Sequence, residues 1–204
     1  MLLIVCALPA ELRYYDAPAG VTIIAGGVGP VESAIAVARA LALARTPYDA
    51  VIHAGIAGAY RDRARVGDAR IVTHDALADF GLEGGGALAL PAGTLVETAE
   101  ADPALVARLA GILTHARGLT VSTVTATDAT GVRLHVRYGH DVETMEGFAV
   151  LRAAALAGTP AVGVRGISNY IGDRTASEWD FAAGARATAT ALEAIVARLA
   201  SARV

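Results

Sequence analysis

The chain has 204 residues, of which 54% are hydrophobic and 18% charged, so it is a globular protein with a substantial core and not a disordered segment. This length fits one domain covering residues 1–204. The net charge of −3 argues against a nucleic-acid partner, and the single cysteine rules out an internal disulfide. Pro9 and Glu11 end the first apolar run too early for a signal peptide or a membrane span, so we expect a cytoplasmic protein with no membrane partner.

The histidines show none of the spacings that hold a metal ion, and the chain lacks cysteine pairs that could complete such a site. We therefore expect no metal and no other cofactor. These histidines are His53, His74, His115, His135 and His140.

In the first half of the chain, short apolar runs typical of buried parallel strands alternate with glycine-rich turns. The turn at 26–30 lacks the third glycine of a dinucleotide fingerprint, because Glu32 stands in that place, so a tight turn is the simpler interpretation. The run at 84–86 is expected to be a loop tip, since no helix start follows it. Strands are expected at Leu2–Ala7, Val21–Ala25, Asp49–Ala54 and Ala69–Thr73, and a helix at Val31–Arg45.

The second half continues this alternation and indicates an α/β fold. Asp102 is a plausible N-cap for its first helix. We expect helices at 103–116, from Val142 to the Gly158-Thr159-Pro160 stop, and at Ala182–Ala202, with strands at Leu119–Thr125 and Ala161–Ile167.

Three polar residues stand where ligands usually bind. Glu11 follows the first strand, Glu146 falls in the first turn of an apolar helix, and Asn169 comes where a buried strand ends. Because ligands of open α/β sheets bind at the carboxyl ends of strands, these groups could face one pocket. The alternative for Glu11 is that it only opens a helix near its positive end.

Six motifs occur in an order that resembles the purine nucleoside phosphorylase and nucleosidase superfamily over nearly the whole chain. The resemblance implies a three-layer α/β/α sandwich around a mixed sheet, a small-molecule nucleoside as substrate, and a homo-oligomer, as a dimer or larger. The motifs are Ala7-Leu8-Pro9-Ala10-Glu11, Gly27-Val28-Gly29, Ala54-Gly55-Ile56-Ala57-Gly58, Val66-Gly67-Asp68, Glu143-Thr144-Met145-Glu146-Gly147 and Val164-Arg165-Gly166-Ile167-Ser168-Asn169.

The resemblance also implies roles for single residues. In the nucleosidases that cleave methylthioadenosine and S-adenosylhomocysteine, the glutamate matched by Glu11 activates the attacking water. The glutamate matched by Glu146 binds the ribose hydroxyls, and the methionine matched by Met145 lines the sugar side of the pocket. The phosphate loop of the phosphorylases has no counterpart in this chain, so the resemblance favours hydrolysis.

Asn169 departs from the adenine-cleaving members, which carry an aspartate at that position. An amide suits a 6-oxopurine, because its NH2 group donates to O6 while its carbonyl oxygen accepts from a protonated N7. A buried donor that faces the wrong group costs about 1–3 kcal/mol, which is roughly a 10- to 100-fold preference. We therefore expect hypoxanthine rather than adenine as the leaving base.

The last third of the chain looks like the futalosine hydrolases within this superfamily, on its Glu-Thr-Met-Glu-Gly motif and on the loop with Arg174 and Trp179. This resemblance implies release of hypoxanthine from futalosine in a route to menaquinone. Backbone groups near Gly58 and Thr125 are expected to frame the pocket. Phe148 or Phe80 could stack on the substrate or lie in the core, and Arg174 could bind a benzoate carboxylate or be an ordinary surface residue.

Two other functions fit the same motifs. One is a different superfamily member, either a methylthioadenosine/S-adenosylhomocysteine nucleosidase or an inosine-type phosphorylase. The other is a non-catalytic nucleoside-binding protein, against which Glu11 argues, since binding alone needs no base beside a water molecule. Ile56 departs from the serine that many nucleosidases carry in that turn, so no hydroxyl is expected there.

Overall fold

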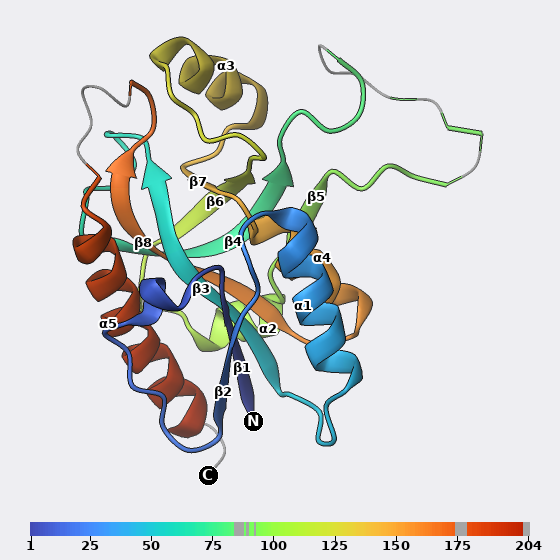
Figure 1. The fold of residues 1–204 in the computed structure, drawn as a ribbon, viewed down its shortest axis with the longest axis vertical. Coiled ribbons are helices and arrows are strands. Elements are labelled where there is room, and N and C mark those ends of the chain that lie inside the picture. Colours follow the sequence, from blue (N-terminus) through green and yellow to red (C-terminus); the bar gives the residue numbers. More distant parts are fainter. Residues whose placement is uncertain (84–87, 89, 92, 174–178, 202–204) are drawn as a thin grey trace.

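A single mixed sheet, with helices on both of its faces, forms the centre of this molecule (Figure 1). The computed structural model describes the chain except residues 84–87, 89, 92, 174–178 and 202–204. The strands are β1 (Leu2–Cys6), β2 (Val21–Ala25), β3 (Ala50–Ala59), β4 (Ala69–Leu77), β5 (Thr98–Glu100), β6 (His115–Thr120), β7 (Val142–Thr144) and β8 (Ala161–Tyr170). The helices are the 3₁₀ turn η1 (Pro9–Leu12), α1 (Pro30–Ala42), α2 (Pro103–Arg108), α3 (Asp128–Tyr138), α4 (Gly147–Leu156) and α5 (Phe181–Ser201).

The sheet combines a parallel part with antiparallel pairings that fold it back on itself. Its strand order is β2-β1-β3-β7-β6-β4-β5, and β8 pairs with both β3 and β4. The β1–β2, β1–β3, β3–β8, β4–β6 and β6–β7 pairs are parallel, and β3–β7, β4–β5 and β4–β8 are antiparallel. These pairs close a ring through β3, β7, β6, β4 and β8. The mixed sheet was expected from the sequence, but this closure was not.

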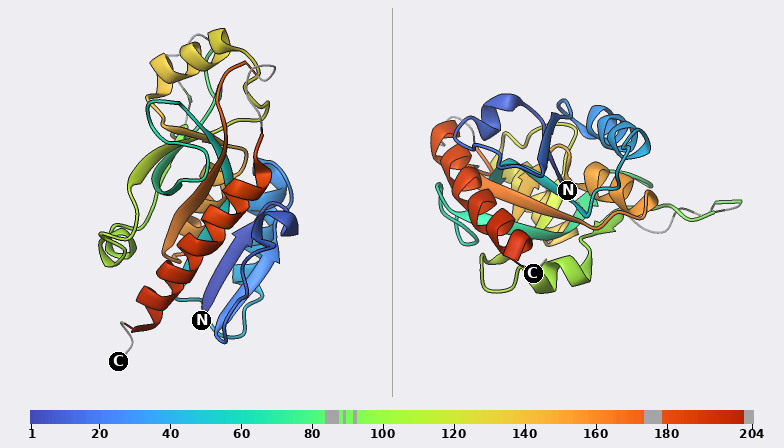
Figure 2. Two further views of the ribbon diagram at one scale, coloured as in Figure 1. Left: turned by 90° about the vertical axis from the view of Figure 1, so that its left-hand side faces the viewer. Right: turned by 90° about the horizontal axis from the view of Figure 1, so that it is seen from below.

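Alternate residues of the buried strands feed two separate cores, one on each face of the sheet, because strand side chains point in turn to opposite sides. In β1, Leu2 and Ile4 join the core beneath α2 and α5, whereas Leu3 and Val5 join the core beneath α1 and α4. The two further views show α5 on one side of the sheet and α1 with α4 on the other (Figure 2). The expected three-layer α/β/α sandwich is confirmed.

Several strands run further than their apolar patterns predicted. The expected strand ends at Ala54, Thr73 and Ile167 fall inside β3, β4 and β8. The ring closure explains these longer strands. The second half of β3 pairs with both β7 and β8, so its backbone N–H and C=O groups remain hydrogen-bonded past the expected strand end. Gly55 and Gly58, which the sequence indicated as turn residues, lie within β3.

Other boundaries were wrong in the second half of the chain. The helix expected through Ala116 ends at Arg108, and β6 begins at His115 after Gly111, whose φ of +80° stops the helix. The strand expected to run through Thr125 ends at Thr120, and Val142–Thr144 forms β7 instead of opening a helix. Helix α3 was not predicted, although the Thr127 side chain caps it by accepting from Thr130 N.

The remaining expectations on secondary structure divide into three groups. The strands β1 and β2, the final helix and the Asp102 N-cap, whose carboxylate accepts from Leu105 N at 2.7 Å, are confirmed. The helix expected at Val31–Arg45 starts one residue earlier and ends at Ala42. The loop tip expected at 84–86 lies outside the described residues.

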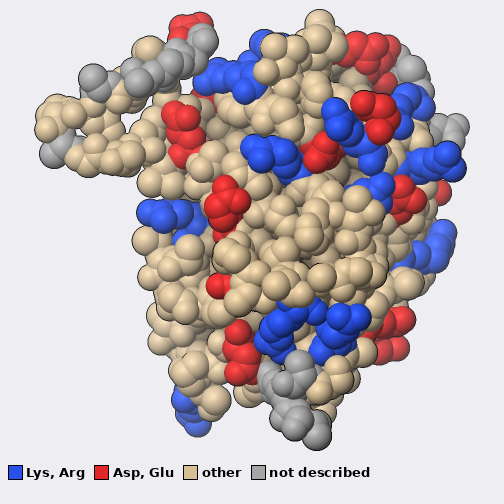
Figure 3. Space-filling model, turned by 180° about the vertical axis from the view of Figure 1, so that it is seen from behind, with Lys and Arg blue, Asp and Glu red and all other residues tan. Residues whose placement is uncertain are grey.

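The surface carries charges of both signs side by side. On the face opposite to that of Figure 1, basic and acidic side chains are interspersed among uncharged ones (Figure 3). No helix in the part of the chain that the structure describes is long and apolar enough to span a bilayer. Within the same residues, no cluster of three or more His, Cys, Asp or Glu side chains is placed to hold a metal ion.

Candidate active site

A cavity of about 280 Å³ lies at the carboxyl ends of β1, β3 and β8, where parallel strands of this sheet end together. It contains all three polar residues that the sequence singled out. Glu11 reaches it from η1, Glu146 from the turn before α4, and Asn169 from β8. The lining residues are Ala7, Leu8, Glu11, Val28, Ile56, Ala57, Gly58, Val121, Val124, Glu143, Thr144, Met145, Glu146, Ser168, Asn169, Trp179 and Phe181.

Backbone N–H groups from two directions hold the Glu11 side chain. Its Oε2 accepts from the N–H groups of Ala7 and Leu8 at 2.9 and 3.0 Å, and its Oε1 accepts from Ile56 N at 3.1 Å. A Cβ at position 55 would lie 2.8 Å from Oε1, so Gly55 makes room for the carboxylate inside β3. The group is 7% exposed and fixed in orientation, as a base that must meet one water molecule requires.

Glu146 stands immediately before α4 and not in its first turn, which corrects the position expected from the sequence. Its Oε1 accepts from Gly29 N at 2.9 Å, in the turn between β2 and α1. Burial raises the pKa of its carboxyl group, and the hydrogen bond from Gly29 and the charge of Arg165 oppose that rise.

Arg165 of β8 supplies positive charge beneath the two glutamates. It is 2% exposed, and its Nη1 donates to the carbonyl oxygens of His53 and Val164 at 3.1 and 3.2 Å. Its charge acts on both Glu11 and Glu146. The sequence contained a signal for this residue, because an arginine within the apolar run of β8 must be buried and paired.

Asn169 lies within β8 and not after its end, because the strand continues to Tyr170 past a bulge opposite Ala57 and Gly58. Its Oδ1 accepts from the Ser168 hydroxyl at 2.8 Å, and its Nδ2 donates to the Tyr170 carbonyl oxygen at 3.2 Å. A Cβ on Gly58 would lie 3.0 Å from Nδ2. The missing side chain at Gly58 therefore leaves the space into which the amide extends.

Two of the expected contact residues lie elsewhere, and a third is not among the described residues. Thr125 does not line the cavity; its N–H and hydroxyl donate to Glu143, at 3.0 and 2.5 Å. Phe148 packs against the core beneath α1 and α4, and Arg174 falls outside the described residues. The side-chain directions of Thr125 and Phe148 depend on tertiary packing, which no local pattern shows.

Met145 and Gly58 line the cavity, as expected. Its aromatic residues are Trp179, two residues before α5, and Phe181, the first residue of α5, rather than Phe148 or Phe80. The sequence motif had included Trp179, but nothing in the pattern indicated that Phe181 turns toward the strand ends.

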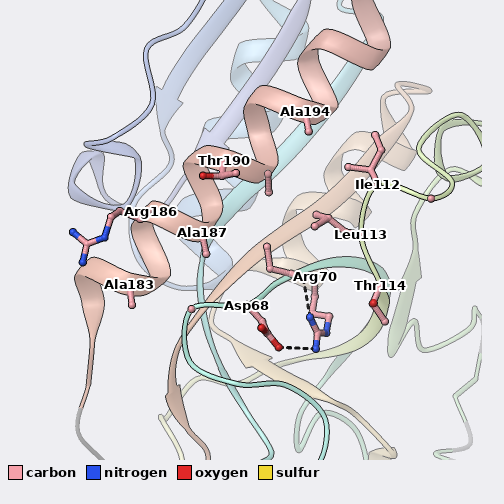
Figure 4. A pocket seen from close by; sticks show the side chains of 14 residues that line it. Asp68, Arg70, Ile112, Leu113, Thr114, Ala183, Arg186, Ala187, Thr190 and Ala194 are labelled. Carbon is pink, nitrogen blue, oxygen red and sulfur yellow. Dashed lines mark hydrogen bonds and ion pairs between the residues drawn. The ribbon is translucent and has the colours of Figure 1, made fainter.

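A larger cavity, of about 990 Å³, lies between the start of α5 and the loop at 111–114 (Figure 4). Its α5 side carries small side chains such as Ala183 and Ala187, and Asp68 pairs with Arg70 at 3.0 Å. Neither Glu11 nor Glu146 lines it. The smaller cavity, where Glu11, Glu146 and Asn169 meet, is therefore the candidate active site.

The fold and this cavity define the class of protein. Residues 11–201 match the family model described as "Phosphorylase superfamily". The chain is 37% identical to the futalosine hydrolase of Streptomyces coelicolor over 170 residues, which cover 79% of this chain and 72% of that relative. The chain belongs to the futalosine hydrolase family of this superfamily, and it is an enzyme of the nucleosidase class.

Solved structures share the fold at low sequence identity. The futalosine hydrolase of Helicobacter pylori strain 26695 superposes with a TM-score of 0.78 at 16% identity, covering 96% of each chain. The methylthioadenosine/S-adenosylhomocysteine nucleosidase of Colwellia psychrerythraea 34H, in complex with adenine, gives 0.80 at 20% identity, covering 97% of this chain and 95% of that one. One fold carries both enzymes, so the fold alone does not decide which base is released.

Proposed function

We propose that this protein hydrolyses the N-glycosidic bond of futalosine and releases hypoxanthine, a step of menaquinone synthesis. The observation that carries the proposal is the meeting of Glu11, Glu146 and Asn169 in one cavity at the strand ends. The name of the relative from Streptomyces coelicolor supports the same substrate.

Glu11 acts as the general base. A carboxylate has about four acceptor positions, and three of those on Glu11 are taken by backbone N–H groups. One acceptor position is therefore left for the attacking water. Because the three donors are main-chain groups, the carboxylate does not need to reorganise when it takes the proton.

Glu146 binds the ribose. Gly29 N occupies Oε1, so Oε2 is the oxygen that accepts from the 2′- and 3′-hydroxyls. The carboxylate charge also stabilises the positive sugar that forms as the glycosidic bond breaks. Met145 covers the sugar from the same turn, and Trp179 and Phe181 provide apolar surface for the substrate.

Asn169 selects the leaving base. The Ser168 hydroxyl and the Tyr170 carbonyl oxygen orient its amide, and each amide atom keeps capacity for one further hydrogen bond. The NH2 group donates to O6 of hypoxanthine, and the carbonyl oxygen accepts from N7–H. Since an amide cannot supply a proton, N7 is protonated through water or the base leaves as a stabilised anion.

A methylthioadenosine/S-adenosylhomocysteine nucleosidase is the alternative, and the shared fold of the Colwellia psychrerythraea enzyme favours it. Chromatography of the released base distinguishes the two functions, with futalosine, methylthioadenosine and inosine as substrates, each with and without phosphate. We expect hypoxanthine from futalosine at the same rate in both conditions. Adenine as the main product would favour the alternative, and strict phosphate dependence would contradict hydrolysis by Glu11-activated water.

A further inference from the structure

Asp75 of β4 is a buried carboxylic acid for which the proposed reaction has no role so far. It is 0% exposed, and its Oδ1 accepts from the Thr120 hydroxyl at 2.7 Å. Its Oδ2 has no hydrogen-bond partner within the described ranges of the chain. A buried polar atom without a partner costs folding free energy, so an apolar side chain would be the less costly occupant of this position.

Neighbouring elements lack side chains where this carboxyl group lies. A Cβ on Gly118 of β6 or on Gly147 of α4 would overlap Asp75 Oδ2. Neither glycine has a positive φ, so backbone conformation does not explain why glycine occupies these positions. Both positions are occupied by glycine to admit a carboxyl group into the core.

The same carboxyl group supports the turn that carries Glu146. Thr120 donates to Asp75, and Thr120 Oγ1 accepts from Phe148 N at 2.8 Å, in the first turn of α4. Gly147, which lies against Oδ2, directly follows Glu146 in the chain. A movement of Asp75 is therefore transmitted through two contacts to the main chain that presents Met145 and Glu146 to the cavity.

The charges around Asp75 are few. Burial raises the pKa of Asp75 to about 7, and the charge of Glu146 adds to this rise, whereas the Thr120 hydroxyl, the charge of Arg165 and the Phe148 backbone N–H oppose it. The nearest parts of β6 and α4 contribute Gly118, Thr120 and Gly147, which do not titrate. The adjacent residue on β4, His74, pairs with Glu100 of β5 at 2.6 Å.

We propose that Asp75 is a positioning residue for the nucleosidase reaction: as a neutral carboxylic acid it supports the Thr144–Phe148 turn, and its ionisation displaces that turn and lowers activity. The reason is electrostatic, since ionised Asp75 places a second buried negative charge beside Glu146 with an oxygen that no donor satisfies. This inference rests on the proposed function, because Glu146 must bind the ribose for its position to matter.

The test compares Asp75→Asn, Asp75→Ala and the surface control Asp62→Asn by kcat and KM for hypoxanthine release between about pH 5.5 and 9. The amide keeps an acceptor for Thr120 and cannot ionise. We expect Asp75→Asn to stay within about threefold of wild type near pH 6 and to lose the decline that wild type shows above about pH 7. Asp75→Ala should lower kcat/KM by about tenfold at every pH, and Asp62→Asn should keep the wild-type profile.

Two results would overturn the inference. One is an Asp75→Asn profile with the same alkaline decline as wild type, and the other is a loss of more than about 100-fold near pH 6, which would mean that the ionised form is required. Wild-type base release separates this inference from the proposed function. If the wild type releases no base, the proposed function fails; if it does and either result is found, only the role of Asp75 fails.

A second measurement does not depend on turnover. The infrared band of a buried, protonated carboxylic acid should be present in wild type near pH 6 and missing from Asp75→Asn. Its absence from wild type at that pH would contradict the neutral state even in a fully active enzyme.

Discussion

The N–H group of Gly29 donates to Glu146 Oε1 at 2.9 Å and joins two turns that are 117 residues apart in the chain. Gly29 is the N-cap residue of α1 and has a φ of +93°, a conformation that points its N–H toward the cavity. The carboxylate that we propose to bind the ribose is therefore oriented by a glycine whose backbone conformation a larger residue adopts only with strain.

Gly29→Ala is expected to raise KM by about tenfold with a smaller change in kcat, because the strained turn would no longer aim its N–H at Glu146. Gly20→Ala is the matched control. Gly20 has a φ of +85° and open space around it, so it carries similar strain away from the cavity. Steady-state kinetics and thermal melts of both variants give the comparison; equal KM values with equal losses of stability would contradict a role for Gly29 in binding.

Glu11→Gln should lower kcat by about 10²- to 10⁴-fold, because an amide cannot accept the proton of the attacking water. The Kd for an intact nucleoside, measured by calorimetry, should change by less than about threefold, since binding does not need the base. Glu193→Gln, on the exposed side of α5, is the control and should behave as wild type. Normal turnover by Glu11→Gln would remove the general base from the mechanism.

Gly166→Ala should destabilise the fold by about 3 kcal/mol or more, because the added Cβ would overlap the Gly184 carbonyl oxygen and lie 2.6 Å from Thr188 Oγ1. A backbone carbonyl of α5 cannot move aside as a flexible side chain can. Gly131→Ala in α3 is the matched control. The nearest atom to its new Cβ is 3.4 Å away, so we expect it to be neutral or to stabilise by up to about 1 kcal/mol. Urea unfolding measures both, and equal midpoints would contradict the close contact between β8 and α5.

The pH dependence of the free energy of unfolding should reveal the titration of Asp75. Its pKa is about 7 in the folded state, against 3.8 for a free side chain, so the folded chain binds more protons than the unfolded chain between these values. The free energy of unfolding therefore falls as pH rises through this window, by at most about 4 kcal/mol.

Two buried histidines act in the opposite direction. Burial lowers the pKa of His140 to about 4 and that of His53 well below its ordinary value, so their contribution to stability is lost as pH falls. The quantity to measure is therefore the difference in unfolding free energy between wild type and Asp75→Asn. It should move in favour of the variant as pH rises from about 4 to 7; a difference independent of pH would show that Asp75 does not titrate there.

The sequence predicts those residues of the candidate site whose positions follow from a local pattern. Glu11 and Asn169 belong to polar ends of apolar runs, and Glu146 stands beside the start of an apolar helix. The strand-end rule therefore brought these residues together without knowledge of the strand order.

What the sequence did not show depends on contacts between distant elements. The sequence pattern indicates turn residues at Gly55 and Gly58, yet both lie within β3 and make room for Glu11 and Asn169. Arg165 is a charge inside an apolar run, a pattern that indicates a buried residue but not its partners, whereas Asp75 follows the polar pair Thr73-His74 and has no such signal. Whether Phe148 lies near the substrate or in the core depends on packing beneath α4, which the sequence does not show.

The measurement that tests the central claim most directly is the ratio of kcat/KM for futalosine to that for methylthioadenosine, in wild type, Asn169→Asp and Asn169→Ala. Wild type should favour futalosine, and Asn169→Asp should shift the ratio toward methylthioadenosine by about 10- to 100-fold, because its acid can donate to N7 and accept from the 6-amino group. Asn169→Ala should lower both rates without gaining activity on the adenine nucleoside. A ratio that is the same in wild type and Asn169→Asp would contradict the assignment of base selection to Asn169.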